Sequence, residues 1–144
     1  MEAIIKHVEG LTFVAKADSN HWVTIDGPRQ FFGSEAASRP MELLLIALGS
    51  CTASDVAATL QKKRVKLDDF EVKVNGERVL EYPKIFTKIH IEYIFYGKNI
   101  RHKDIERAIE LSQDKYCPIS AMLKKTVEIT YSYQIIENGV GEIL

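Results

Sequence analysis

Short stretches of alternating apolar and polar residues, and one long apolar stretch, divide the chain into predicted elements. The alternating stretches end at turns rich in Gly, Pro, Asp and Asn, which is typical of strands. Pro40 suits the first position of the long helix that follows it. The predicted strands are Ala3–Val8, Leu11–Ala17, Trp22–Ile25, Asp68–Val79, Ile85–Tyr96 and Val127–Ile136, and the predicted helices are Met41–Lys63, His102–Tyr116 and Ile119–Lys124. This order predicts an α+β fold rather than a doubly wound parallel sheet.

The long predicted helix is apolar nearly all round between Leu43 and Ala58. Such a helix is expected to be buried on most sides. Its strongest apolar run, Leu43 to Leu48, is far shorter than a membrane span. The first ten residues carry charges at Glu2, Lys6 and Glu9, which does not fit a signal peptide. We therefore expect a cytoplasmic protein with no membrane partner.

Length and charge narrow the class of protein. The 144 residues suit a single domain over residues 1–144, and the net charge of −1 gives no general attraction to nucleic acid. The chain holds two cysteines and no HExxH, CxxC, CxxH, GxGxxG or Walker motif, so no metal or cofactor is expected. The thiols of these two cysteines, Cys51 and Cys117, are therefore the candidate reactive groups.

Cys51 lies in the middle of the long predicted helix, on the same face as Leu48 and Asp55. The apolar neighbours suit a packed core cysteine. A carboxylate one helical turn away opposes formation of the thiolate, and a position in mid-helix gains little from the helix dipole. Both interpretations of Cys51, a packing residue or a reactive thiol, stay open on these facts.

Cys117 directly precedes Pro118, which suits the first position of the last predicted helix. Cys117 is then the N-cap residue, with its sulfur close to free backbone N–H groups. Such a position lowers the pKa of a thiol. The alternative is a small buried residue at a junction between two helices.

Two sequence motifs together resemble the OsmC/Ohr family of osmotically inducible and organic hydroperoxide resistance proteins. The first motif runs from Ser38-Arg39-Pro40-Met41-Glu42 through Leu48-Gly49-Ser50-Cys51 to Asp55-Val56, and the second is Cys117-Pro118-Ile119-Ser120. The cysteines are 66 residues apart, as in the family. The Met-Glu version of the first motif is similar to the YhfA-like branch.

The resemblance implies an OsmC-like fold, in which antiparallel sheets wrap around long central helices in an intertwined homodimer. It also implies reduction of organic hydroperoxides. Cys51 attacks the peroxide and becomes a sulfenic acid, Cys117 resolves it to a disulfide, and an external dithiol reduces the disulfide. The N-cap position favours Cys117 as the more acidic thiol, but for the roles of the two thiols we follow the resemblance.

The sequence departs from the peroxide-reducing members at the residues that activate the thiolate. Met41 stands at the position of the family glutamate, ten residues before Cys51. Glu42 is about half a turn of the helix away from the Cys51 face and is best explained as a carboxylate in the first helical turn. Arg39 is our first choice for the family arginine, the alternative being a solvated loop residue.

His21 and Asp55 complete the candidate site residues. His21 lies in the turn after Asp18-Ser19-Asn20, and a histidine can activate a thiol as a base or stabilise its thiolate. A solvated turn histidine is the plainer alternative. Asp55 is hypothesised to orient His21 in a Cys–His–Asp arrangement.

Two functions follow from these residues. The first is a two-cysteine peroxidase of oxidative-stress defence. The second is a protein of the same fold without efficient peroxidase activity, which binds a small apolar or thiol ligand at the dimer interface. Met41 is the feature that favours the second function.

Overall fold

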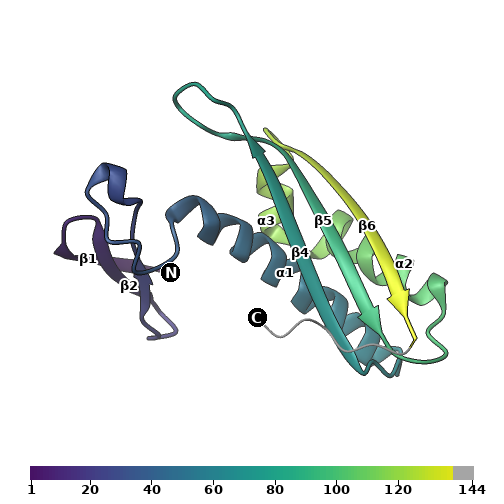
Figure 1. The fold of residues 1–144 in the computed structure, drawn as a ribbon. Helices are drawn as coiled ribbons and strands as arrows, with labels where there is room; N and C mark the ends of the chain where they lie inside the picture. The colour runs from purple at the N-terminus through teal and green to yellow at the C-terminus, as the bar shows by residue number, and fades with distance from the viewer. Residues whose placement is uncertain (138–144) are drawn as a thin grey trace. The chain divides into compact units, whose positions relative to one another are not determined.

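A computed structural model describes residues 1–137 and divides the chain into two compact units, residues 1–44 and 45–144. The elements, shown in Figure 1, are β1 (Ala3–Glu9), β2 (Thr12–Ala17), β3 (Val23–Ile25), the short helix η1 (Arg29–Phe31), α1 (Pro40–Lys62), β4 (Asp69–Arg78), β5 (Phe86–Tyr96), α2 (His102–Leu111), η2 (Ser112–Tyr116), α3 (Pro118–Leu123) and β6 (Glu128–Ile136). Helix α1 begins in the first unit and continues into the second. These elements confirm the predicted α+β class.

The N-terminal unit is an antiparallel sheet in the order β1-β2-β3, followed by a loop that leads into α1. The buried carboxylate of Asp26 organises this loop. It accepts hydrogen bonds from the backbone N–H groups of Gly27, Ser34 and Ala36 and from the Thr12 hydroxyl. These donors, the Gly27 N–H first, lower the pKa of Asp26 against the opposing effect of burial. The loop is therefore fixed by one ionised side chain.

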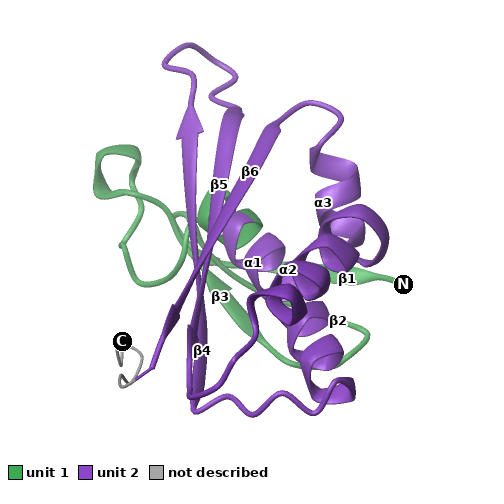
Figure 2. Cartoon of the chain, turned by 90° about the vertical axis from the view of Figure 1, so that its right-hand side faces the viewer, with its two compact units in different colours: residues 1–44 green, residues 45–144 purple. Residues whose placement is uncertain are grey.

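The C-terminal unit is a three-stranded sheet in the order β4-β5-β6, with helices on one face (Figure 2). Strands β4 and β5 form the predicted antiparallel hairpin. Strand β6 runs parallel to β5, so the expectation of purely antiparallel sheets is wrong for this pair. The reason is the connection, because α2, η2 and α3 return the chain to the end of the sheet at which β5 starts.

The core of the C-terminal unit lies between the sheet and the helices. Strand β5 alternates as predicted, with Ile89, Ile91 and Tyr93 buried and His90 exposed on the other face. Other core side chains come from the helices and from β5, among them Leu48, Val56 and Leu60 of α1, Ile105 and Ile109 of α2, and Phe95. Toward its C-terminal end β5 is buried on both faces, because Ile94 and Tyr96 are buried as well.

Helix α1 is long and apolar enough, by length and composition, to cross a membrane. Its residues Leu48, Val56 and Leu60 are nevertheless packed in the core, which is the arrangement of a core helix in a folded domain. Within this chain it is buried on one side only, and Ile46 on another side is 55% exposed. The prediction of burial on most sides is therefore not met by one chain alone.

Candidate functional site: a thiol pair beside a carboxylate

The fold brings Cys51 and Cys117 together from two helices. Cys51 lies in the middle of α1, and Cys117 precedes α3. The two sulfur atoms and a carboxylate oxygen of Asp55 all lie within 4.8 Å of one another. Both cysteines are free thiols, Cys51 half-buried and Cys117 buried. Three of the five predicted site residues therefore meet at one place.

Cys117 is the N-cap of α3, as its position before Pro118 predicts. Its backbone is extended, Pro118 occupies the first turn, and the sulfur accepts a hydrogen bond from the Ser120 N–H at 3.3 Å. A sulfur acceptor satisfies one of the backbone donors that a helix leaves free at its start. This contact holds the sulfur of Cys117 against the first turn of α3.

Cys51 is in a less favourable electrostatic environment. Burial raises its pKa to about 11, with further increases from the hydrogen bond with Cys117 and from the charge of Asp55. The backbone N–H of Ile119 opposes these effects and lowers the pKa of Cys51 in part. Asp55 therefore acts on Cys51 in the direction that its place on the helix predicts.

A buried network of hydrogen bonds holds the segment before Cys117 against α1 and the sheet. The Thr52 hydroxyl, next to Cys51 in the chain, lies 2.6 Å from the Tyr93 hydroxyl and 2.8 Å from that of Ser112. The amide of Gln113 donates to Thr52 and Tyr93, and its carbonyl oxygen accepts from the Ser120 hydroxyl. All five residues are buried.

Ser112 extends this network to the carboxylate, since its hydroxyl lies 3.0 Å from Oδ2 of Asp55. The network therefore begins at Asp55, beside Cys51, and ends at Ser120, whose backbone N–H donates to the sulfur of Cys117. The segment Ser112–Tyr116 is a π-helix, a widened turn that is frequent at functional sites. Within residues 1–137, every deeply buried side-chain nitrogen and oxygen has a hydrogen-bond partner.

Sequence reasoning missed the roles of Thr52, Tyr93 and Gln113. The one sequence feature that pointed to this network is Ser112, a polar residue on the otherwise apolar inner face of the predicted helix. A buried hydroxyl needs a partner, so Ser112 implied polar groups opposite it. Their identity depended on the packing of α1 against the segment after α2.

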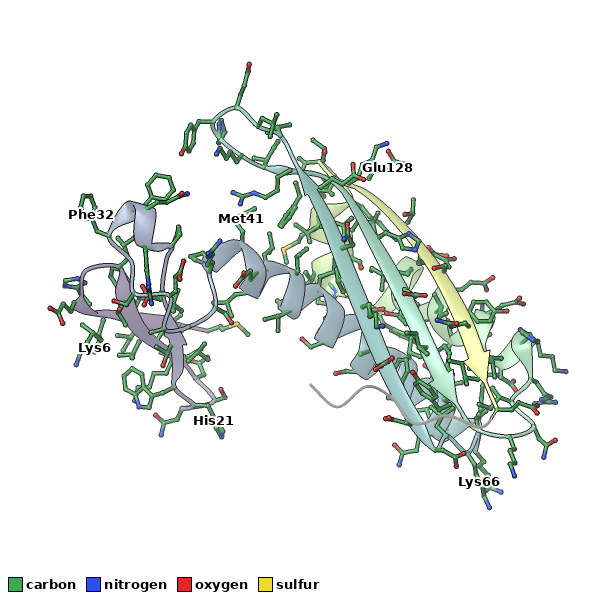
Figure 3. The ribbon with its side chains drawn as sticks, viewed as in Figure 1. Lys6, His21, Phe32, Met41, Lys66 and Glu128 are labelled. Atoms are coloured by element: carbon green, nitrogen blue, oxygen red, sulfur yellow. The ribbon has the colours of Figure 1, made fainter. Side chains whose placement is uncertain are left out.

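Arg39 and His21 lie in the N-terminal unit, and their predicted roles at the thiols stay predictions. Arg39 is the residue before α1, and its side chain pairs with Glu35 at 3.9 Å. Its backbone N–H donates to the carboxylate of Glu42, the capping contact expected of a first-turn glutamate. His21 is exposed in the connection between β2 and β3, and Met41 lies in the first turn of α1 (Figure 3).

A groove of about 320 Å³ runs along the same face of α1 as Cys51, toward the C-terminal end of the helix. Asp55, Ala58 and Lys62 continue that face at helical spacing, and Thr59 and Tyr116 complete the lining. The groove is partly polar and has a cationic and an anionic side chain. Asp55 is the member of the thiol–carboxylate cluster that lines this groove.

This architecture defines a two-cysteine thiol protein of mixed α+β fold, with one cysteine in the core helix and the other capping a short helix. Residues 33–132 match the family model of the OsmC-like protein, and the chain belongs to this family. Family membership and the two adjacent thiols indicate a redox or peroxide-related role.

The similar proteins span nearly the whole chain. Protein YhfA of Escherichia coli K12 is 41% identical over 136 residues, which cover 94% of this chain and 98% of YhfA. A hypothetical protein from Aquifex aeolicus has 33% identity, a TM-score of 0.83 and coverage of 96% and 97% of the two chains. An organic hydroperoxide resistance protein from Legionella pneumophila, at 16% identity and a TM-score of 0.68 over 93% and 97% of the chains, shares the fold. The resemblance to the YhfA-like branch is confirmed.

The charge of Asp55 can be tested by alkylation of the reduced protein. A thiol reacts with iodoacetamide as its thiolate, so a raised pKa makes the rate at Cys51 keep rising above pH 9. Asp55→Asn keeps a hydrogen-bond acceptor for Ser112 and removes the negative charge, so it lowers the pKa of Cys51. Alkylation of the Cys51 peptide at pH 8, followed by mass spectrometry, is therefore expected to become faster.

The exposed carboxylate of Asp68 supplies the matched control, Asp68→Asn. This control is expected to leave the alkylation profile of Cys51 unchanged. Slower alkylation of Cys51 in Asp55→Asn than in the wild type would show that the carboxylate does not oppose the thiolate.

Proposed function

We propose that this protein reduces organic hydroperoxides with Cys51 and Cys117 as its two redox-active thiols. The observation that carries the proposal is the meeting of the two sulfur atoms, from residues 51 and 117, at the same place. Membership of the OsmC-like family supports it. The Legionella relative described as an organic hydroperoxide resistance protein supports the choice of substrate class.

The reaction needs two steps on the protein and one outside it. The Cys51 thiolate attacks the terminal oxygen of the hydroperoxide, the O–O bond breaks, and the alkoxide leaves as an alcohol after taking a proton. Cys51 is then a sulfenic acid. Cys117 attacks that sulfur, a disulfide forms and water leaves. An external dithiol supplies two electrons and two protons and returns both thiols.

Access favours Cys51 as the first nucleophile, whereas the N-cap position favours Cys117. Cys51 is half-buried, whereas Cys117 is only 3% exposed, so a peroxide reaches Cys51 more easily. Cys117 has the N–H donor of Ser120 on its sulfur. We assign the attack to Cys51, because a peroxide must contact the sulfur before the acidity of the thiol matters. Cys117 needs only to reach the adjacent sulfenic acid.

The thiolate of Cys51 needs an activating positive charge, because burial and Asp55 raise its pKa. Met41 supplies neither a charge nor a proton acceptor where the peroxide-reducing relatives have a glutamate. Arg39 and His21 are the residues we propose for this role. We also propose that the chain acts as one OsmC-like domain in the cytoplasm, where thiol reductants are available.

The second candidate is a ligand-binding protein without efficient peroxidase activity. Met41 and the raised pKa of Cys51 favour it, since both slow the attack on a peroxide. Its ligand would be a small apolar molecule or a thiol. Peroxide turnover separates the two candidates.

Turnover of cumene hydroperoxide with a dithiol reductant is the direct test. Wild-type protein is expected to consume the peroxide catalytically, and Cys51→Ser is expected to abolish consumption. Cys117→Ser is expected to react once per chain and to accumulate a sulfenic acid that dimedone traps. Ser54→Ala, one turn of α1 from Cys51 on an exposed position, is the control and keeps activity.

Unchanged turnover in Cys51→Ser would contradict the assignment of the nucleophile. Absence of turnover in the wild type would favour the ligand-binding candidate.

We further propose that the functional unit is a homodimer in which a second copy covers the open face of α1. Ile46 is 55% exposed on a helix that is apolar nearly all round. A groove of about 370 Å³ lies beside it, lined mostly by apolar side chains of α1 and β4: Leu45, Ile46, Gly49, Ala53, Val72 and Val74. Exposed apolar patches of this kind mark protein interfaces.

Ile46→Arg is expected to shift the protein from dimer to monomer, because a charge in an apolar interface loses its hydration without a partner. Leu80→Arg, at a position that is 90% exposed in the connection between β4 and β5, is the control and is expected to stay dimeric. Sedimentation equilibrium measures both. A wild-type monomer at micromolar concentration, or a dimeric Ile46→Arg variant, would contradict this interface.

A further inference from the structure

Cys51, Cys117 and Asp55 form a set of metal-ligand atoms as well as a thiol pair. Two sulfur atoms and one carboxylate oxygen, from the middle of α1 and the start of α3, lie within 4.8 Å of one another. Tetrahedral zinc with Zn–S bonds of about 2.3 Å and a Zn–O bond of about 2.0 Å places two sulfurs about 3.8 Å apart and sulfur and oxygen about 3.5 Å apart. Shifts of about 1 Å or less therefore suffice to bind one ion.

We propose that the reduced protein binds one thiophilic divalent cation, of the zinc class, through the sulfur atoms of Cys51 and Cys117 and the carboxylate of Asp55. The fourth position of the tetrahedron takes a water molecule, as in zinc sites with three protein ligands. A groove lined by Asp55, Lys62 and Tyr116 lies beside the carboxylate. No sequence motif predicts this site, because its ligands come from separate helices that are far apart in the sequence.

The surroundings of the carboxylate match those of a metal ligand. The Ser112 hydroxyl donates to Oδ2 of Asp55, which fixes the orientation of the carboxylate. Hydrogen bonds of this kind to a ligating group tune metal affinity. Ser112 is itself held by Thr52 inside the buried network, so the orientation is set by the core.

The charges of the site also favour a cation. Two thiolates and a carboxylate carry a charge of −3, which is unfavourable without a positive ion and falls to −1 with a divalent one. Binding releases the two thiol protons to solvent. Each sulfur also has a backbone N–H donor beside it, Ile119 for Cys51 and Ser120 for Cys117. The negative charge of Asp55 opposes a free thiolate at Cys51, but the same charge favours the binding of a metal cation.

Metal binding and disulfide formation exclude each other, because both use the same sulfur electron pairs. The oxidised protein is therefore expected to bind no metal, and the loaded protein to resist oxidation. This consequence links the site to the proposed peroxidase cycle, but metal binding by the reduced protein does not depend on that cycle.

Titration of the reduced, metal-free protein with Co²⁺ under anaerobic conditions tests the proposal. Wild-type protein is expected to bind one ion per chain, with a thiolate-to-cobalt charge-transfer band in the near ultraviolet and tetrahedral bands in the visible. Zinc is expected to displace the cobalt and remove these bands. Cys51→Ser and Cys117→Ser are each expected to weaken binding at least about tenfold and to lower the charge-transfer intensity.

The variant Asp55→Asn tests whether the carboxylate is a third ligand or whether the two sulfurs bind the metal alone. It is expected to weaken cobalt binding at least about tenfold, whereas Asp68→Asn is expected to match the wild type. Circular dichroism confirms that each variant is folded. Absence of the charge-transfer band in the wild type, or an unchanged affinity in Asp55→Asn or Cys51→Ser, would overturn the proposal. No peroxide is present in this titration, so its outcome is independent of peroxidase activity.

Discussion

The hydrogen bonds of Thr52 are the constraint on which the site depends. Thr52 is adjacent to Cys51 on α1, and its hydroxyl meets Tyr93 of the sheet and Ser112 of the π-helix. Gln113 continues the contact to Ser120, whose backbone N–H donates to the sulfur of Cys117. A buried polar group without a partner costs about 1–3 kcal/mol, so each of these contacts favours a single arrangement of the segments. That arrangement is the one in which the two sulfurs are neighbours.

The same arrangement creates a conflict between position and reactivity. The thiols are well placed for a disulfide, but burial and the charge of Asp55 raise the pKa of Cys51 and oppose the thiolate. A cationic side chain beside Cys51 would resolve this conflict, whereas a metal ion bound by the two sulfurs would keep them reduced.

The sequence predicted the elements within a few residues, because hydropathy period, Pro40 and the Cys117-Pro118 pair are local signals. It also predicted that Cys117 is the N-cap of the last helix and that the carboxylate of Asp55 opposes the thiolate of Cys51. The parallel pairing of β6 with β5, the π-helix at Ser112–Tyr116 and the buried network were not predicted. These features depend on contacts between distant residues, such as Thr52 and Gln113, which are 61 residues apart. No local pattern carries such information.

The equilibrium between the dithiol and the disulfide, measured in glutathione redox buffers, tests this account most directly. Thr52→Val removes the hydroxyl and keeps the shape of the side chain, so it should loosen the Cys117 segment. The account predicts a shift toward the dithiol of at least about fivefold, corresponding to about 1 kcal/mol, with the fold retained. Thr24→Val, at an exposed position of β3, should leave the equilibrium unchanged. An unshifted equilibrium in folded Thr52→Val would contradict the claim that this network holds the two thiols together.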